Sequence, residues 1–516
     1  MPPSPAQPTR SALVELLILA APTVATMTSY TLMQFVDKLM VSRIGAEPIY
    51  VGAQGNGGLA AFVPIAVMMG FITVINTYVA QNLGAGKPEK APAYAWAGMW
   101  LTLAYWVLVM LPFGLLLGPL LEWMRDPTLT GEPLAQAQRR DALAAGYGRI
   151  LIFGSIFTMA ARAIAQYFYG MHRPMVVLIA SLTGNLVNFV LNTVLIFGPT
   201  SPAKTDIGML DAWFAFAAGL CRRIGVPALG LDGSGYATVI GTAVELLIPV
   251  VLFLSARYHR EFATRLAWRP SARHMRDLFK IGWPGSLMFG NEMLCWGFFM
   301  VYLVGTFGPM HSTAGWIAHQ WMTLSFMPAV GLSVALTASV GKCMGMKRPD
   351  LAAQRAWLGV AMAAVYMTLC GVAFVLFRND LTRLFIQRDT PPETAEMIVR
   401  LGAGFLVATA AFQFFDAIAM SLSGALRGAG DTKFTGVATL LLSWSILVVG
   451  GLAMVRFAPR LQSLGPWIAA AAYIVLLSVM ILARFLTGKW RGMSMVESSS
   501  EVEAKPTVPL PSGASA

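Results

Sequence analysis

The amino-acid sequence predicts an all-α membrane protein with twelve transmembrane helices, built as two parallel repeats of six helices. Three observations carry this prediction. Of the 516 residues, 56% are hydrophobic and only 12% are charged, whereas a soluble chain carries about 25% charged residues. Long apolar segments recur between short polar breaks, as membrane spans do. A stretch of the first half also reappears in the second half.

The apolar segments define the expected helices. At a rise of about 1.5 Å per residue, about 20 residues cross a hydrocarbon core roughly 30 Å thick. We expect spanning helices near residues 11–41, 58–83, 94–120, 143–169, 174–198, 233–256, 277–305, 313–341, 352–377, 396–425, 432–457 and 464–486. An even number of spans places both termini on one side of the membrane.

Polar segments divide the chain into parts. We expect an N-terminal cytoplasmic segment at 1–10, a first lobe at 11–256, a cytoplasmic connector at 257–276, a second lobe at 277–490 and a disordered cytoplasmic tail at 491–516. The apolar run after residue 10 is too long for the core of a cleaved signal peptide. The tail is rich in Ser, Pro and Glu, and such a composition does not fold alone.

The distribution of charge indicates the orientation. The net charge is +12, and the basic residues lie mostly in short segments between the apolar runs, with a concentration at residues 257–280. No basic stripe is interleaved with aromatic residues, so nucleic-acid binding is not expected. Cytoplasmic loops carry the excess of Lys and Arg. We therefore expect a multi-pass protein of the cell inner (plasma) membrane with both termini and the connector in the cytoplasm.

One segment departs from the pattern of spans. Residues 199–229 contain an apolar piece at 208–220 that is too short to cross a bilayer. Two alternatives remain open at this point. The piece is a loop packed on the outer face of the protein, or it is a helix lying in the membrane interface.

The internal repeat points to a transporter. Residues 79–96 read VAQNLGAGKPEKAPAYAW, and residues 340–357 read VGKCMGMKRPDLAAQRAW. The two stretches share Val, Gly, Pro, Ala and Trp positions, and each follows the second apolar helix of its half. Pro22 and Pro284 occupy matching places in the first helix of each half. Two parallel halves related by an axis along the membrane normal are typical of transporters.

The sequence lacks the residues of an ATPase or a hydrolase. It contains no phosphate-binding loop, no H-E-x-x-H motif and no G-x-S-x-G motif. Its four cysteines are scattered and show no metal-ligand spacing. We therefore expect no enzyme activity, no cofactor and no metal beyond the coupling ion. A transporter of this kind uses an ion gradient, and H⁺ and Na⁺ both remain open.

Coupling to H⁺ or Na⁺ requires ionisable groups within the bilayer, where such groups are costly and functional by default. The candidates inside the expected helices are Asp37, Glu245, Glu292 and Asp416. Glu15 and Asp277 lie at helix starts, where water and the helix dipole account for them. Arg162 also lies within a helix, and we expect it to snorkel or to pair with a carboxylate.

Polar side chains support one of these acids. Asn188 and Asn192 are four residues apart and share a helix face. Amide oxygens on one face suit a hard cation, or hydrogen-bond a carboxylic acid. The alternative is interhelical hydrogen bonding with no further role. Thr238, Thr242 and Glu245 also share a face.

Five short motifs resemble the multidrug and toxic compound extrusion (MATE) family, in order and on the expected helices, over about residues 11–490. They are Phe35-Val36-Asp37 with Arg43-Ile44-Gly45, the stretch at 79–86, the stretch at 188–192, Ala318-His319-Gln320, and the stretch at 426–432. The resemblance implies the fold of the MOP flippase superfamily, with two six-helix lobes around a central cavity.

The resemblance also implies two sites for the coupling ion. The family's N-lobe site falls on Asp37, Asn188, Asn192 and Thr238. The C-lobe site of the NorM-like branch falls on Glu292 and Asp416, with Phe412 where that branch often has a tyrosine. Asn192 stands where the DinF-like branch has an aspartate, so the chain looks more like NorM. Glu245, Gln320 and Gln81 are secondary candidates.

The expected function is export of amphipathic, often cationic, small molecules in exchange for H⁺ or Na⁺. The runner-up is a flippase of lipid-linked oligosaccharides from the same superfamily. Its anionic substrate calls for Arg and Lys in the cavity, and the deep charges here are mostly carboxylates. A membrane receptor or enzyme without transport is a third possibility. The expected partners are the lipid bilayer and drug-like molecules, and a monomer is expected.

Overall fold

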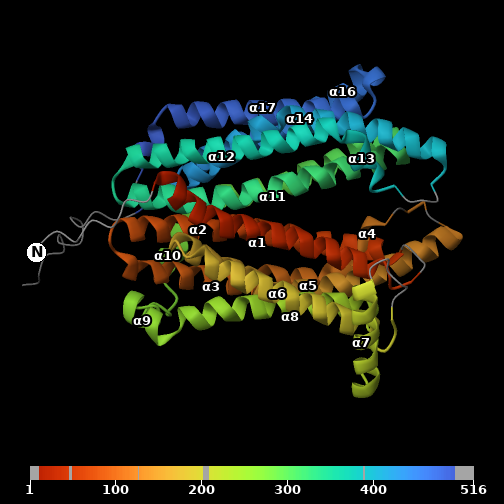
Figure 1. The fold of residues 1–516 in the computed structure, drawn as a ribbon, viewed down its shortest axis with the longest axis horizontal. Helices are drawn as coiled ribbons and strands as arrows, with labels where there is room; N and C mark the ends of the chain where they lie inside the picture. Colours follow the sequence, from red (N-terminus) through yellow and green to blue (C-terminus); the bar gives the residue numbers. More distant parts are fainter. Residues whose placement is uncertain are drawn as a thin grey trace, which may run out of the picture.

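The computed structural model describes residues 11–45, 49–125, 127–128, 130–201, 208–386, 390–493 and 495. Within these residues, twelve helical segments are long and apolar enough to cross a membrane, which confirms the expected number. The spans run side by side in Figure 1. The expected N-terminal segment at 1–10, and the tail apart from residues 491–493 and 495, lie outside the described residues.

The first lobe contributes six spans. Its first, second and fourth spans are single helices, α1 (Ala12–Val41), α2 (Ile49–Gly84) and α5 (Gly131–Gly170). The third span joins α3 (Ala91–Tyr105) to α4 (Leu111–Met124) through a π-helical turn, Trp106–Met110. The last two are α6 (Pro174–Phe197) and α8 (Gly230–Phe253).

The second lobe repeats this arrangement. Its spans begin with α10 (Ala272–Phe298), which continues as a π-helix and a 3₁₀ turn to Phe307. They continue with α11 (Pro309–Gly345), α12 (Pro349–Leu376) and α14 (Pro392–Ala429). The eleventh span joins α15 (Thr432–Leu442) to α16 (Gly451–Phe457), and α17 (Leu464–Leu486) is the twelfth.

Proline and glycine set several helix ends. Pro174, Pro349 and Pro392 stand in the first turn of their helices, where the missing N–H costs nothing and the fixed φ suits the helix. Gly430 caps α14 with φ of 97°, a conformation that a residue with a Cβ rarely adopts. Residues 431 and 432 can therefore turn directly into α15.

Three shorter helices do not span. They are α7 (Gly208–Ile224), α9 (Ala256–Phe262) in the connector, and α13 (Arg378–Arg383). Figure 1 shows α7 lying across the direction of the spans, at the end of the molecule opposite the N-terminus and α9. The segment at 199–229 therefore holds a helix, and its crosswise direction fits the interfacial alternative.

Close backbone contacts show that the two lobes are related by an approximate two-fold axis. A Cβ on Gly84 would lie 2.0 Å from the carbonyl oxygen of Lys342, and a Cβ on Gly345 would lie 2.0 Å from that of Gln81. Gly84 and Gln81 are the repeat equivalents of Gly345 and Lys342. Equivalent glycines of the two lobes therefore contact equivalent backbone positions of the other lobe. The repeat seen in the sequence is thus also present in the structure.

Candidate functional site

A chain of hydrogen bonds surrounds Asp37 in the first lobe. Asn192 Nδ2 on α6 donates to Asp37 Oδ1 on α1 at 2.5 Å and also to Asn188 Oδ1 at 2.9 Å. Asn188 Nδ2 donates to Thr238 Oγ1 on α8 at 3.3 Å, and Thr238 Oγ1 donates to the carbonyl oxygen of Ser234 at 2.9 Å. The structure thus brings together the four residues that the resemblance assigned to the N-lobe site.

Three more residues lie at this cluster. Tyr147 on α5 is close enough to interact electrostatically with Asp37 and lies beside Gln54 and Ser234. Within the part of the chain that the structure describes, Gln54 Oε1, Ser234 Oγ and Asn192 Oδ1 are buried and have no hydrogen-bond partner. Buried polar atoms are normally satisfied. Unpaired oxygens next to a carboxylate suit a small hard cation.

Sequence reasoning missed Tyr147, Gln54 and Ser234. Gln54 lies in the first two turns of α2, six residues after a gap in the described chain, and Tyr147 lies between two glycines in the first half of α5. Neither is near Asp37 in the sequence. Of the three, only Ser234 could have been predicted from the sequence, because it lies four residues before Thr238 and so shares its helix face.

The second lobe holds a pair of carboxylates. Glu292 on α10 and Asp416 on α14 are both partly buried and close enough to interact electrostatically. Tyr473 on α17 donates from its hydroxyl to Glu292 Oε1 at 3.3 Å. In a medium of low dielectric, two neighbouring carboxylates share a proton or hold a cation between them.

Position 412 offers no hydroxyl to the acidic pair, whereas Tyr473 does. Phe412 is fully buried within the core of the second lobe and offers no polar atom. The hydroxyl that contacts the acidic pair belongs to Tyr473 on α17, which donates to Glu292. Nothing in the local sequence of α17 distinguishes Tyr473 from an ordinary packing residue.

Glu245 belongs to a separate cluster in the first lobe. The hydroxyl of Tyr30 on α1 donates to Glu245 Oε1, and Arg162 Nη1 on α5 lies 3.9 Å from the same oxygen. The Arg162 guanidinium stacks over the Tyr30 ring at 3.8 Å. The expected pairing of Arg162 with a carboxylate is thus present. Glu245 is balanced by a cation, whereas Asp37 has only neutral hydrogen-bond partners.

The other secondary candidates lie elsewhere. Gln81 bridges the lobes, because its Nε2 donates to the carbonyl oxygen of Gly428 at 2.9 Å and its Oε1 accepts from the backbone N–H of Met495 at 2.9 Å. Gln320 is partly buried on α11, next to His319, whose ring packs against Trp296 and Trp316. Neither residue joins the hydrogen bonds of Asp37 or Glu292.

Hydrogen bonds between the lobes gather toward the end that carries the termini. Thr77 Oγ1 donates to the carbonyl oxygen of Arg427 at 2.9 Å, and His172 Nε2 lies 3.1 Å from the carbonyl oxygen of Ala338. Glu15 at the start of α1 pairs with Arg355 of the second lobe at 2.5 Å. The position of Glu15 at a helix start predicts a residue satisfied by water and the helix dipole, whereas the structure pairs it with an arginine of the other lobe.

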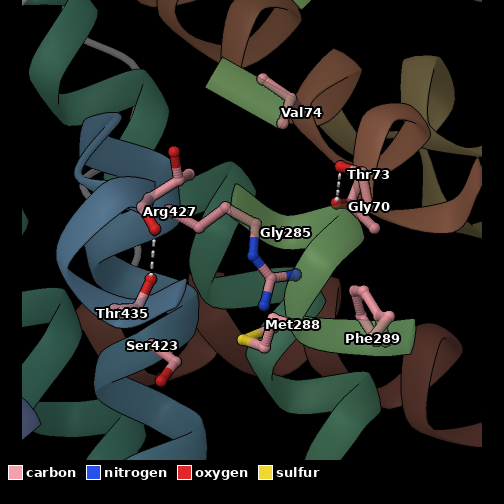
Figure 2. Close-up of a pocket in the computed structure, with 10 residues that line it drawn as sticks. Gly70, Thr73, Val74, Gly285, Met288, Phe289, Ser423, Arg427 and Thr435 are labelled. Carbon is pink, nitrogen blue, oxygen red and sulfur yellow. Dashed lines mark hydrogen bonds between the residues drawn. The ribbon is translucent and has the colours of Figure 1, made fainter. Parts of the chain in front are cut away.

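A small cavity lies between the lobes next to these contacts. Residues of α2, α10, α14 and α15 line it, and it offers about 20 Å³ to water, enough for about one molecule. Figure 2 shows the guanidinium of Arg427 reaching from α14 toward Gly285 and Met288 of α10. At this end, the two lobes are therefore packed too closely for a drug-sized molecule to pass.

Two six-helix lobes with acidic clusters inside the spans define a secondary transporter, because each lobe carries ionisable groups where the bilayer makes them costly. The family model MatE matches residues 22–194 and 290–451, more than half of the chain. The chain therefore belongs to this family.

Curated relatives and solved structures agree with this assignment. The chain is 27% identical over 483 residues to a probable multidrug resistance protein NorM of Synechococcus sp., covering 92% of this chain and 94% of the relative. It is 28% identical to a probable NorM of Pseudomonas syringae pv. tomato, covering 84% and 85%. A crystal structure of MATE in complex with MaL6 shares the fold, with a TM-score of 0.77 at 20% identity, covering 93% of this chain and 96% of that chain.

Proposed function

We propose that this protein exports amphipathic small molecules, cationic ones included, in exchange for H⁺ or Na⁺. The names of the NorM relatives, which the chain matches over most of their length, support multidrug resistance as the outcome. The two acidic clusters support coupling to a cation. Each chain contains both lobes and both clusters, so a monomer suffices for the cycle.

The observation that carries this proposal is the environment of Asp37. Its carboxylate accepts a hydrogen bond from Asn192, and unpaired oxygens lie in the same cluster. A carboxylate that has only neutral partners within a membrane is stabilised by taking up a proton or a cation. A carboxylate that is paired with an arginine, such as that of Glu245, already has its charge balanced and does not require a proton or a metal cation.

Charge neutralisation at Asp37 can affect the contact between the two lobes, because α1 takes part in both. Asp37 lies near one end of α1, and the other half of α1 packs on the second lobe, where Leu16 and Leu19 contact Leu332 and Leu336 of α11. α1 is one continuous helix with Pro22 between these two regions, so a displacement near Asp37 is passed along it to the contact with α11. Protonation or ion binding at Asp37 loosens or tightens the bond to α6, and α1 carries that change to the interface between the lobes.

The contacts between the lobes support a state that is closed on the side of the termini. Thr77 with Arg427, His172 with Ala338 and Glu15 with Arg355 all lie on that side. We propose that the terminal side is cytoplasmic, as the basic connector indicates. A state closed on that side would take up a proton or Na⁺, and release the exported molecule, on the opposite, outer side.

Transport by purified protein in liposomes tests the proposal. A fluorescent lipophilic cation is loaded, and its movement is followed under an imposed pH gradient or an imposed Na⁺ gradient. Movement against the dye gradient under one of these supports the exchange and identifies the ion. Movement under neither gradient contradicts it, and translocation of a lipid-linked sugar in place of the dye would favour the flippase.

A further inference from the structure

A groove on the second lobe carries three arginines at one end and an apolar floor beyond them. The arginines are Arg378 and Arg383 of α13 and Arg400 of α14, and Glu396 is the one acidic residue among the lining residues. The groove has a volume of about 890 Å³. Its charged end therefore has two positive charges in excess, and all three arginines are exposed.

The floor of the groove is a ridge of small apolar side chains on α14, at Val399, Ala403, Val407 and Ala411. Residues four apart on a helix lie above one another, so the ridge is continuous. Val375 at the end of α12 and Leu464 at the start of α17 form its walls. Apart from the arginine end, the groove is an apolar trough.

The groove opens away from the ion site. Val407 lies nine residues from Asp416 on the same helix, which places it about half a turn around the axis. Asp416 points toward Glu292 inside the lobe, whereas Val407 is 41% exposed. The trough therefore faces the surface of the lobe that the bilayer covers, between α12 and α17.

The length of the trough matches one leaflet. From Arg400 to Ala411 the helix rises about 16 Å, and half of a hydrocarbon core is about 15 Å thick. Arg378 and Arg383 follow directly after the end of α12 at Leu376, and Arg400 lies in the third turn of α14; the proposed site takes this level as that of the lipid headgroups. Figure 1 shows α13 near the end of the molecule opposite the N-terminus, so the leaflet concerned is the one away from the termini.

We propose that this groove binds one anionic phospholipid of that leaflet, with the phosphate on Arg378, Arg383 and Arg400 and an acyl chain along the α14 ridge. Arginine is suited to phosphate because its planar fork donates two parallel hydrogen bonds. One N–H of Arg378 donates to the carbonyl oxygen of Val375 at 2.9 Å, which orients this side chain and leaves its other donors for the phosphate. The bound lipid joins α12, α13, α14 and α17 at the headgroup level.

Lipid retention by the purified full-length protein tests this site. The protein is equilibrated in detergent with phosphatidylglycerol or with phosphatidylcholine of the same acyl chains, washed, and its retained lipid is quantified by mass spectrometry. We expect phosphatidylglycerol to be retained in preference, and the R378Q/R383Q/R400Q variant to bind it about tenfold or more weakly, since charge-assisted bonds are lost.

Two further variants make the result specific. The R223Q/R456Q/R460Q variant removes three exposed arginines outside the groove and should retain the lipid as the native chain does. The A411W variant fills the exposed end of the ridge without changing charge and should also weaken retention. Equal retention by the groove variant and its control, or displacement of the lipid by millimolar inorganic phosphate alone, would overturn the proposal.

Discussion

The carboxylate of Asp37 and the pair formed by Glu292 and Asp416 are both acidic groups inside the membrane, but their surroundings differ. Asp37 is surrounded by amide and hydroxyl groups, so its charge is reduced only when a proton or cation arrives. Glu292 and Asp416 are close enough to interact electrostatically, so the two carboxylates together form one site of negative charge. Both arrangements make binding of a cation favourable inside a membrane.

At the residue scale, E292Q and D416N should each lower gradient-driven export by about tenfold or more, because removing one carboxylate removes the shared proton or cation site. The measurement is dye export from vesicles, corrected for the amount of inserted protein. D380N, which changes an exposed aspartate of α13, is the control. Undiminished export by both E292Q and D416N would assign the pair a packing role alone.

Residue-scale predictions from the sequence succeeded where the polar groups share a helix face. Asn188 and Asn192 are four residues apart, and their common face could be read directly. Tyr473 and Tyr147 were not found, because they reach their acids from distant helices, and helical periodicity gives no information on which helices pack together. The resemblance indicated that Phe412 brings no hydroxyl, and the structure shows that Tyr473 donates one to Glu292.

At the element scale, the apolar cores of the spans were predicted within a few residues, but some ends were not. The second helix begins at Ile49 and the fourth at Gly131, whereas the apolar segments suggested 58 and 143. Both extensions carry polar residues, Gln54 in the first and Asp141 in the second, and Asp141 pairs with Arg125 at 2.9 Å. A helix predicted from an apolar run ends where the apolar run ends, so these polar extensions were not predicted.

The glycine contacts at the ends of α2 and α11 control whether the lobes can close. Since a Cβ at Gly84 would overlap the Lys342 backbone, G84A should disfavour the closed contact. Overpacking costs about 1–3 kcal/mol, or roughly 5- to 160-fold in the ratio of closed to open states. Distances between spin labels at Glu89 and Arg348, both exposed, report that ratio.

G55A is the matched control for G84A. Gly55 lies on the same helix, and a Cβ there would meet nothing within 4 Å. We expect its distance distribution to equal that of the native protein, while G84A gains a population with longer distances. Identical distributions for the two variants would show that the glycine contact does not set the equilibrium.

The burial of His172 beside Lys342, where the ring contacts Ala338 of the other lobe, should make closure sensitive to pH. Burial first, and then the nearby Lys342, lower the pKa of the His172 imidazole to about 4, below its ordinary value of about 6.5. The closed contact thus holds the neutral ring. It is fully favourable above about pH 6.5 and weakens as the pH falls toward 4, because protonation favours the separated lobes.

The same pair of spin labels measures this effect. Between about pH 7.5 and pH 5, the native protein should gain longer distances, and H172Q should not, since glutamine keeps a donor but does not titrate. A pH response of equal size in H172Q would assign the effect to another group. An absence of any response in the native protein would contradict the proposed linkage.

At the scale of the whole molecule, the repeat explains why one end closes symmetrically while each lobe keeps its own acidic cluster. The contacts at Gly84 and Gly345 are equivalent, but the clusters around Asp37 and Glu292 are not. The fold could be predicted from composition, span lengths and the repeat. The closed side could not, because it depends on contacts between residues hundreds of positions apart.

The orientation of the whole molecule is tested by labelling. A cysteine in place of Arg269, an exposed residue of the connector, is introduced in a chain whose partly exposed Cys370 is replaced by serine. An impermeant thiol reagent should label it in opened cells but not in intact ones. Labelling in intact cells would place the connector and both termini on the outer side and reverse the assigned direction of export.

Gradient-driven export by D37N is the most direct test of coupling. The variant keeps the shape of the side chain and should still insert and fold, but it cannot take up a proton or provide a charge for Na⁺. In liposomes that contain the native chain, D37N or the control D350N, whose native carboxylate is exposed, dye movement is recorded with and without the gradient. We predict that the gradient stimulates the native chain and D350N but not D37N. Equal stimulation of all three would contradict a coupling role for Asp37.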